Sequence, residues 1–130
     1  MINSNAYDYI NVLDKAADAS WLRESTITNN IANVDTPGYK RQDVDFESVL
    51  KSKLNQSKYI SLDNKVSSVK LSDLNATTYT DSVNYSYRLD GNNVDIDTEE
   101  AELASEQLKY EGLTNSITQE FSRLKSVMSS

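Results

Sequence analysis

The chain has no cysteine and no histidine among its 130 residues. Without these residues it cannot form a Ser-His-Asp triad, a cysteine nucleophile, a zinc finger, an iron–sulfur site or a disulfide framework. We therefore expect that the chain is not an enzyme and binds no metal and no cofactor.

Long apolar runs are also absent from the sequence. No window approaches the roughly 18 apolar residues that a transmembrane helix needs. Residues 1–5 have neither the basic nor the apolar region of a signal peptide, so we expect that any export proceeds without a cleaved signal.

Glycine, proline and positive charge are scarce. The chain has three Gly and one Pro, and 20 acidic residues outnumber 13 basic ones, which gives a net charge of −7. Nucleic acid is not expected as a partner, because an acidic chain without a basic stretch is repelled by phosphates. Since no catalytic set of residues is present, a small-molecule substrate is not expected either. The apolar fraction of 38% is low for a compact domain and predicts a thin core.

One acidic run, residues 90–99, has the clustered carboxylates and amides of a calcium loop but not its spacing. A loop beginning at Asp90 needs Asn or Asp at its fifth position, Gly at its sixth and Glu at its twelfth. The chain has Val94, Asp95 and Ala101 at these positions. A turn followed by a helix cap is the better interpretation.

The N-terminal segment has apolar or small residues at alternating steps of four and three. They are Ala6, Ile10, Leu13, Ala17, Ser20, Ile27, Ile31 and Val34, with Glu24 in the single gap. This heptad spacing is typical of a helix that packs along another helix. It predicts one helix from about residue 5 to residue 33, which ends where Asn33 can adopt a left-handed cap and Pro37 restricts Thr36.

The C-terminal segment has the same period. Its stripe consists of Leu103, Gln107, Tyr110, Leu113, Ile117, Phe121, Leu124 and Met128. A capping box predicts the start of this helix, with Asp97 as N-cap, Glu100 three residues later, and Ile96 packed against Ala101.

The middle of the chain has a different pattern. Residues Thr36, Pro37, Gly38 and Tyr39 predict a type II turn, because Pro suits its first central position and Gly supplies the positive φ of the second. Helical spacing from Phe46 to Leu54 predicts a short helix. Four β-prone pieces follow, of which the last alternates best and is the strongest strand candidate. These pieces are Tyr59–Leu62, Val66–Leu71, Thr77–Thr80 and Val83–Leu89.

Together these patterns predict a mainly α fold in one structural unit. Long N- and C-terminal helices pack as a coiled-coil-like pair, and a small irregular middle segment contains the β pieces. The three parts are residues 1–36, the N-terminal helix; 37–93, the variable middle with a short helix and β pieces; and 94–130, the C-terminal helix.

A single pair of helices does not cover all of the apolar side chains. Trp21, Leu22, Tyr110 and Phe121 have no obvious cover within one chain, and the stripe residues Ile27, Ile31, Leu113 and Ile117 are expected to need a second chain to be buried. Self-association is therefore one hypothesis. A free-standing helical hairpin that binds a partner helix remains the alternative.

The most particular stretch of the sequence runs from Asn29 to Lys40. Its amides Asn29, Asn30 and Asn33 stand in the last turns of a helix, where amides lower helix propensity and usually have a hydrogen-bond partner. This stretch resembles the N-terminal signature of the bacterial flagellar rod and hook proteins. Residues 41–47, and a second block from Gly91 to Glu100 followed by Leu108, Tyr110 and Leu113, are similar to the proximal rod members of that family.

The resemblance, over about residues 6–47 and 90–128, implies a structural subunit of the flagellar basal-body proximal rod. Such subunits are exported unfolded by the flagellar type III apparatus, without a cleaved signal, and assemble helically into the hollow drive shaft needed for motility. The implied location is the basal-body rod that crosses the periplasm and cell wall. The implied partners are copies of the chain, other rod proteins, and the membrane ring and export gate at the rod base.

The resemblance and the helical stripes also indicate which residues pack between subunits. The motif contributes Asn29, Asn30, Ile31, Ala32 and Asn33, and the stripes contribute Ile27, Leu103, Tyr110, Leu113, Ile117 and Leu124. The turn Thr36, Pro37, Gly38 and Tyr39 is expected to direct the chain out of the tube that the helices form.

Overall fold

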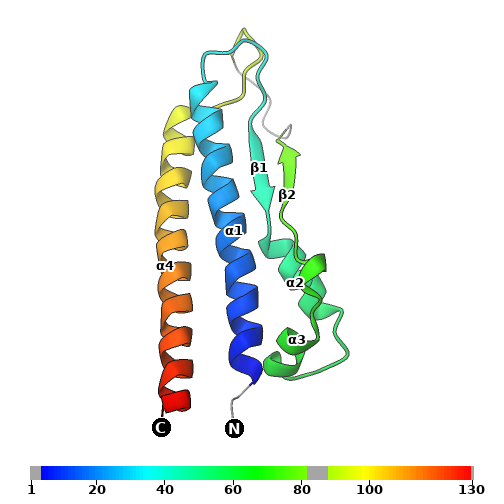
Figure 1. The fold of residues 1–130 in the computed structure, drawn as a ribbon. Helices are drawn as coiled ribbons and strands as arrows, with labels where there is room; N and C mark the ends of the chain where they lie inside the picture. Colours follow the sequence, from blue (N-terminus) through cyan, green and yellow to red (C-terminus); the bar gives the residue numbers. More distant parts are fainter. Residues whose placement is uncertain (1–3, 82–87, 130) are drawn as a thin grey trace.

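Two long antiparallel helices form the frame of the molecule (Figure 1). In a computed structural model, which describes residues 4–81 and 88–129, α1 (Ser4–Ala32) and α4 (Ile96–Ser129) lie side by side. The predicted N-terminal helix is thus confirmed to within a residue at each end. The mainly helical fold, with packed terminal helices and a small sheet, confirms the predicted fold class.

The middle segment packs on the side of α1 that faces away from α4 (Figure 1). It consists of β1 (Gln42–Asp45), α2 (Glu47–Asn55), α3 (Leu62–Ser68), the 3-10 helix η1 (Leu71–Asp73) and β2 (Thr77–Thr80). The two strands are antiparallel, with Gln42 opposite Thr80 and Asp45 opposite Thr77. Since α1 contacts α4 on one face and the middle segment on the other, it is the central element of the fold.

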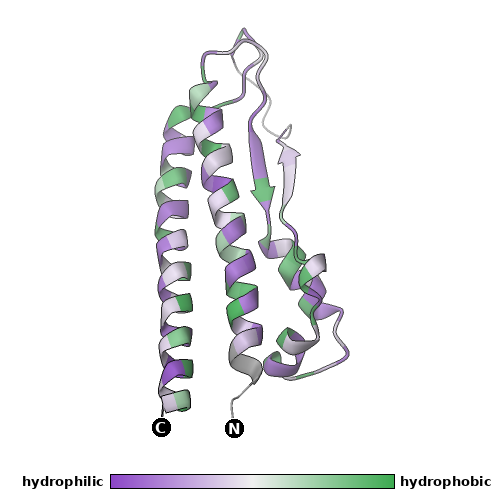
Figure 2. Cartoon of the chain, viewed as in Figure 1, coloured by the Kyte–Doolittle hydropathy of each residue, from purple (hydrophilic) through white to green (hydrophobic). Residues whose placement is uncertain are grey.

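The core is small, as the composition predicts. Ala19, Phe46 and Leu74 form its buried centre between α1 and the middle segment, with half-buried apolar residues around them. Hydrophilic residues alternate with apolar ones along both long helices (Figure 2). None of the described helices has both the length and the apolar character needed to cross a membrane.

Several local predictions are confirmed. The turn after α1 has Gly38 at φ +74°, and the Tyr39 N–H donates to the Thr36 carbonyl at 3.2 Å, as a type II turn requires. The short helix is α2, and Thr77–Thr80 is β2.

Other local predictions are wrong, each for a physical reason. Asn33 has no left-handed backbone, because its side chain instead donates to the Asn29 carbonyl within the helix end. The cap of α4 is Asp95 rather than Asp97, since Asp95 Oδ1 accepts from the N–H groups of Asp97 and Thr98, and Ile96 is 40% exposed instead of stapled.

In the middle segment, two β-prone pieces are not strands. Ser61 caps α3 by accepting from the Asn64 N–H, so Val66 lies in a helix. In the piece Tyr59–Leu62, Ile60 and Ser61 form a bend and Leu62 begins α3. Strand β1 was not expected, because its alternation is short and two of its four residues are acidic. Most of the predicted strand Val83–Leu89 lies outside the described residues.

Candidate functional site

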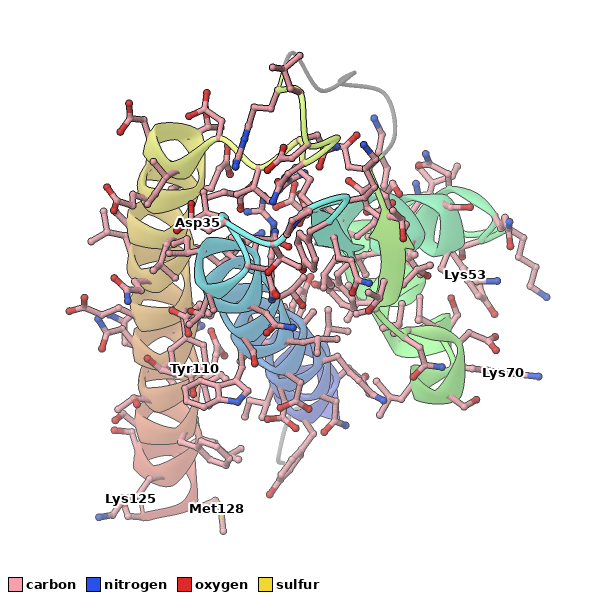
Figure 3. The ribbon with its side chains drawn as sticks, turned by 90° about the horizontal axis from the view of Figure 1, so that it is seen from above. Asp35, Lys53, Lys70, Tyr110, Lys125 and Met128 are labelled. Carbon is pink, nitrogen blue, oxygen red and sulfur yellow. The ribbon has the colours of Figure 1, made fainter. Side chains whose placement is uncertain are left out.

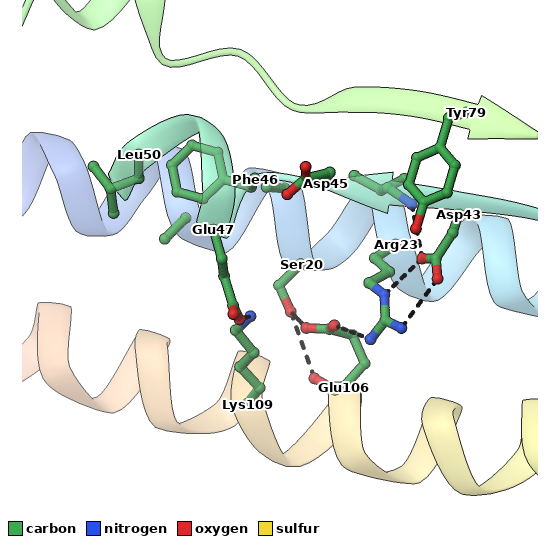
Figure 4. A pocket seen from close by; sticks show the side chains of 13 residues that line it. Ser20, Arg23, Asp43, Asp45, Phe46, Glu47, Leu50, Tyr79, Glu106 and Lys109 are labelled. Atoms are coloured by element: carbon green, nitrogen blue, oxygen red, sulfur yellow. Dashed lines mark hydrogen bonds and ion pairs between the residues drawn. The ribbon is translucent and has the colours of Figure 1, made fainter. Parts of the chain in front are cut away.

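Arg23 connects three elements of the fold. From α1, its guanidinium donates to Asp43 on β1 at 2.7 Å and to Glu106 and Glu102 on α4 at 2.8 and 2.9 Å. Glu106 is only 2% exposed, and its second carboxylate oxygen accepts from the Ser20 hydroxyl (Figure 4). Because a buried carboxylate is costly unless paired, this arrangement ties the position of α4 to that of α1.

Arg23 also affects the titration of its strand partner. Burial raises the pKa of the Asp43 carboxyl, but hydrogen bonds from Arg23 and the Val44 N–H and the charges of Arg23 and Arg41 outweigh it. The pKa of Asp43 therefore lies below its ordinary value, and the carboxyl remains ionised at neutral pH.

Arg41 forms a second set of ion pairs, about two turns of α4 from Glu106 toward the start of that helix. Its guanidinium donates to Glu99 on α4, to Asp81 after β2 at 2.8 Å and to Asp43 at 3.2 Å. Glu99 is 1% exposed. The two arginines thus share Asp43, and together they join α1, α4 and the sheet in one connected network.

Asn30 is the amide of the sequence motif that meets this network. Its side-chain amide donates to the Gln42 carbonyl at 2.8 Å and to Glu99 at 3.1 Å. Its oxygen accepts from the Gln42 N–H at 2.9 Å and the Tyr39 hydroxyl at 3.0 Å. With 0% of its surface exposed, Asn30 confirms that a helical amide here has specific partners.

Asn92 has the same role at the end of α1. Its side-chain amide donates to the carbonyls of Asn33, Val34 and Thr36 at 2.9 to 3.0 Å, and its oxygen accepts from the Val94 N–H at 2.7 Å. These carbonyls belong to the turn that follows α1. Asn92 therefore holds the turn after α1 against the segment that enters α4.

The network is saturated with hydrogen bonds. Among the described residues, every buried side-chain nitrogen or oxygen has a partner. Around Arg23 lies a pocket of ≈ 430 Å³, lined also by Phe46, Leu50 and Lys109 (Figure 4). Since the carboxylates that line it are paired or act as caps, the arrangement is suited to holding elements together.

Sequence reasoning missed most of these residues. Arg23, Arg41, Asp43, Glu99, Glu106 and Asn92 were not among the predicted site residues. One signal was available, because Glu99, Glu106 and Leu113 are spaced by seven and so share the face of α4 toward α1. Acidic residues inside a heptad stripe indicate buried partners on the facing helix.

The predicted packing residues fall into three groups by exposure. Ile27 and Asn30 are 0% exposed and Leu124 is 7% exposed, so the expectation that one chain cannot bury Ile27 is wrong. Asn29 and Ala32 are exposed. The half-buried members are Ile31, Asn33, Leu103, Tyr110, Leu113 and Ile117.

Three of the predicted residues line one groove. Asn29 and Ala32 from α1 and Leu103 from α4 lie along a groove of ≈ 700 Å³, which Trp21 and Gln107 extend. Trp21 is 62% exposed and its ring lies 5.8 Å from that of Tyr110, at 50°. This surface runs along the seam of the two long helices.

A second, more apolar groove lies at the chain ends. It has ≈ 360 Å³ and is lined by residues that include Tyr7, Phe121 and Met128. Phe121 is 51% and Met128 60% exposed, and Figure 3 shows Tyr110 and Met128 extending from α4. No residue of the turn Thr36–Tyr39 lines either groove.

Known proteins that this chain resembles are flagellar basal body rod proteins. Residues 11–40 match the family model described as "Flagella basal body rod protein". The chain is 35% identical over 116 residues to the flagellar basal body rod protein FlgB of Bacillus subtilis, with 89% of each chain covered. It is 38% identical to that of Borreliella burgdorferi, with 75% of this chain and 78% of the relative covered. Identity to that of Salmonella typhimurium is 35%, with 71% and 72% covered.

Proposed function

The chain belongs to the FlgB family of flagellar basal body rod proteins and is a structural rod subunit, and from this premise we propose that it forms part of the proximal rod. In this proposal, copies of the chain assemble helically with other rod proteins into a hollow drive shaft for motility. The membrane ring and the export gate at the rod base are proposed neighbours.

The observation that supports this proposal is the apolar surface that one chain leaves uncovered. Trp21 is 62%, Leu108 70%, Phe121 51% and Met128 60% exposed, all along the two long helices. Trp21 lines one groove and Phe121 and Met128 line another, and contiguous exposed apolar patches are typical of interaction surfaces. A subunit that is enclosed by its neighbours in a rod would bury them.

The packing residues divide into two roles in this proposal. Asn29, Ala32 and Leu103 are proposed to touch a neighbouring subunit, since they line the open groove beside Trp21. The half-buried stripe residues Ile31, Tyr110, Leu113 and Ile117 are proposed to complete that contact. Ile27, Asn30 and Leu124, which are buried, would act indirectly by setting the position of α1 against α4.

The turn and the end of α1 form a separate part of the proposal. Asn33 and the turn Thr36–Tyr39 are proposed to direct the chain out of the helical tube. Their support is the set of bonds from Asn92 to the carbonyls of Asn33 and Thr36, which fixes the angle between α1 and the following strand.

The location and route of the subunit are also proposed at a finer level. The chain is part of the flagellar basal body. We place it in the rod that crosses the periplasm and cell wall, reached through the flagellar type III apparatus without a cleaved signal. We assign it no catalytic activity, since the carboxylates around its polar pocket are already paired or act as caps.

A matched pair of exposed substitutions tests the groove and the function together. Ala32→Arg adds a large charged side chain to the groove at an exposed site, so monomer stability should change by no more than about 0.5 kcal/mol. Thr78→Arg makes the same kind of change on the exposed face of β2.

In cells that depend on this protein for swimming, Ala32→Arg should abolish motility and deplete the protein from purified basal bodies. Cells that carry Thr78→Arg should swim normally. Normal swimming of the Ala32→Arg cells would remove the groove from the packing model. Normal swimming of cells that lack the protein would contradict the proposed function.

A further inference from the structure

The segment between residues 51 and 70 is basic in an otherwise acidic protein. It contains five lysines and one acidic residue, whereas the whole chain has a net charge of −7. None of these lysines forms an ion pair with another described residue. We name this segment, which includes most of α2 and all of α3, the lysine projection; its lysines are Lys51, Lys53, Lys58, Lys65 and Lys70.

The lysine projection has an apolar tip. Tyr59 and Ile60, between α2 and α3, and Leu62, the first residue of α3, are 42%, 95% and 58% exposed. Lys58 lies beside this tip, with its ammonium 5.4 Å from the centre of the Tyr59 ring. An apolar centre within a charged rim has the composition of a protein–protein contact surface.

The outer face of α4 has the opposite charge. Asp97, Glu100 and Glu111 are all exposed and, at 100° per residue, lie within a narrow arc of the helix. This arc is nearly opposite to the face of Glu99 and Glu106, which bond to α1 side chains. The same outer face also contains one large apolar residue, Leu108, which is 70% exposed.

These two surfaces cannot meet within one molecule. The lysine projection lies on one side of α1 and α4 lies on the other (Figure 1). In the view from above, Lys53 and Lys70 extend away from the α4 side (Figure 3). Two complementary surfaces on opposite sides of a subunit suit a head-to-tail contact between copies.

The two surfaces are also displaced along the helix axes. The ion pair of Glu47 with Lys109 sets the start of α2 level with the middle of α4, and the bond from Tyr9 to Asp63 sets α3 beside the first turns of α1. The acidic face lies nearer the other end of the hairpin. The offset is roughly 15 Å at 1.5 Å per residue, so repeated contacts between parallel copies climb instead of closing in a flat ring.

We propose that the lysine projection of one copy docks on the acidic outer face of α4 of the next copy, with Ile60 and Leu62 against Leu108. The inference rests on the proposed function and names the lateral contact of the subunit. It makes self-assembly sensitive to salt, because exposed charges are screened beyond about 8 Å at physiological ionic strength.

A charge-swap experiment tests this contact with two full-length variants. The projection variant has Lys58→Glu and Lys70→Glu, and the helix variant has Glu100→Lys and Glu111→Lys. Each Lys→Glu substitution lowers the net charge of −7 by two units, and each Glu→Lys substitution raises it by two. The projection variant therefore has a net charge of −11 and the helix variant one of −3. Circular dichroism establishes that both are folded, and sedimentation measures association at 20 mM and 500 mM salt.

Wild-type association should weaken about tenfold between the two salt concentrations. Each variant alone should fail to associate, since like charges then face each other, and an equimolar mixture should associate again at low salt. If net charge alone controlled assembly, the helix variant would associate better than wild type. That result, or a mixture that stays monomeric, would overturn the inference.

Two further outcomes separate this inference from the proposed function. Assembly that is unaffected by salt and by both variants would overturn the docking contact while leaving the rod subunit in place. Wild-type protein that associates neither with itself nor with rod proteins at any salt would contradict both. Vesicles of anionic and neutral lipid provide the last arm, since loss of vesicle binding by the projection variant without loss of self-association would assign the projection to a lipid surface.

Discussion

The two ends of the helical hairpin differ in how they are completed. At the loop end, where α1 ends and α4 begins, Arg23, Arg41 and Asn30 join α1, α4 and the sheet. They do so through buried ion pairs and through hydrogen bonds of the Asn30 side-chain amide. At the terminal end, Phe121 and Met128 remain more than half exposed. The loop end satisfies its polar groups within one chain, whereas the terminal end leaves apolar surface for a partner. Fold specificity is therefore assigned to the buried network of the loop end, and the terminal end contributes exposed apolar surface to assembly.

The largest expected effect is at the loop end. Arg41→Met removes the ion-pair partner of Glu99, which is 1% exposed, and leaves that buried charge with the neutral Asn30 amide. The free energy of unfolding in urea should fall by about 3–5 kcal/mol. Arg123→Met is the matched control, because its pair with Glu120 is exposed and should matter by less than about 0.5 kcal/mol. Equal losses in the two variants would mean that the network does not stabilise the loop end.

A smaller effect is expected where Asn92 closes the end of α1. Asn92→Ala removes the acceptor of the buried Val94 N–H and the common donor to the carbonyls of Asn33, Val34 and Thr36. The free energy of unfolding should fall by about 1–3 kcal/mol. Asn75→Ala, which removes one exposed bond to the Ser72 carbonyl, should cost about 0.5 kcal/mol or less. A larger loss in Asn75→Ala than in Asn92→Ala would mean that contacts other than those of Asn92 hold the end of α1.

Acid should weaken the loop end in a defined pH window. The pKa of Asp43 is lower in the folded chain than its ordinary value of 3.8, so its ionised form stabilises the fold. This stabilisation is complete above the unfolded pKa and is lost as pH falls through the folded pKa. Urea unfolding between pH 6 and pH 2 should show a loss below about pH 4. Asp43→Asn should make the free energy of unfolding depend less on pH in this range. An unchanged pH dependence would exclude Asp43 as its source.

The smallest effect on the monomer is expected at the terminal end. Met128→Ser changes a side chain that is 60% exposed, so urea unfolding should shift by less than about 0.5 kcal/mol. Incorporation into basal bodies should nevertheless fall, because the neighbour loses an apolar contact. Leu89→Ser, at an exposed residue of the loop end, should affect neither measurement. Full incorporation of Met128→Ser would remove the functional difference between the two ends.

Local patterns in the sequence were enough for several parts of the fold. The heptad spacing placed α1 to within a residue at each end, and Pro37 with Gly38 specified the turn, because both signals depend on neighbouring residues alone. The same reasoning misplaced the cap of α4 and the conformation of Val66–Leu71. In those cases competing local signals were similar in strength, and Asp95 and Ser61 made the decisive bonds to backbone N–H groups.

The residues that make up the polar network were not accessible in this way. Ser20 bonds to Glu106 across 86 positions and Arg41 to Glu99 across 58, and no short-range spacing links such pairs. Residue spacing therefore settled that this chain would form two long packed helices, and its motif at Asn29–Lys40 indicated the family. The tertiary structure alone decided which charges meet. It also decided that Ile27 is buried while Trp21 is exposed, because burial depends on neighbours that folding brings together.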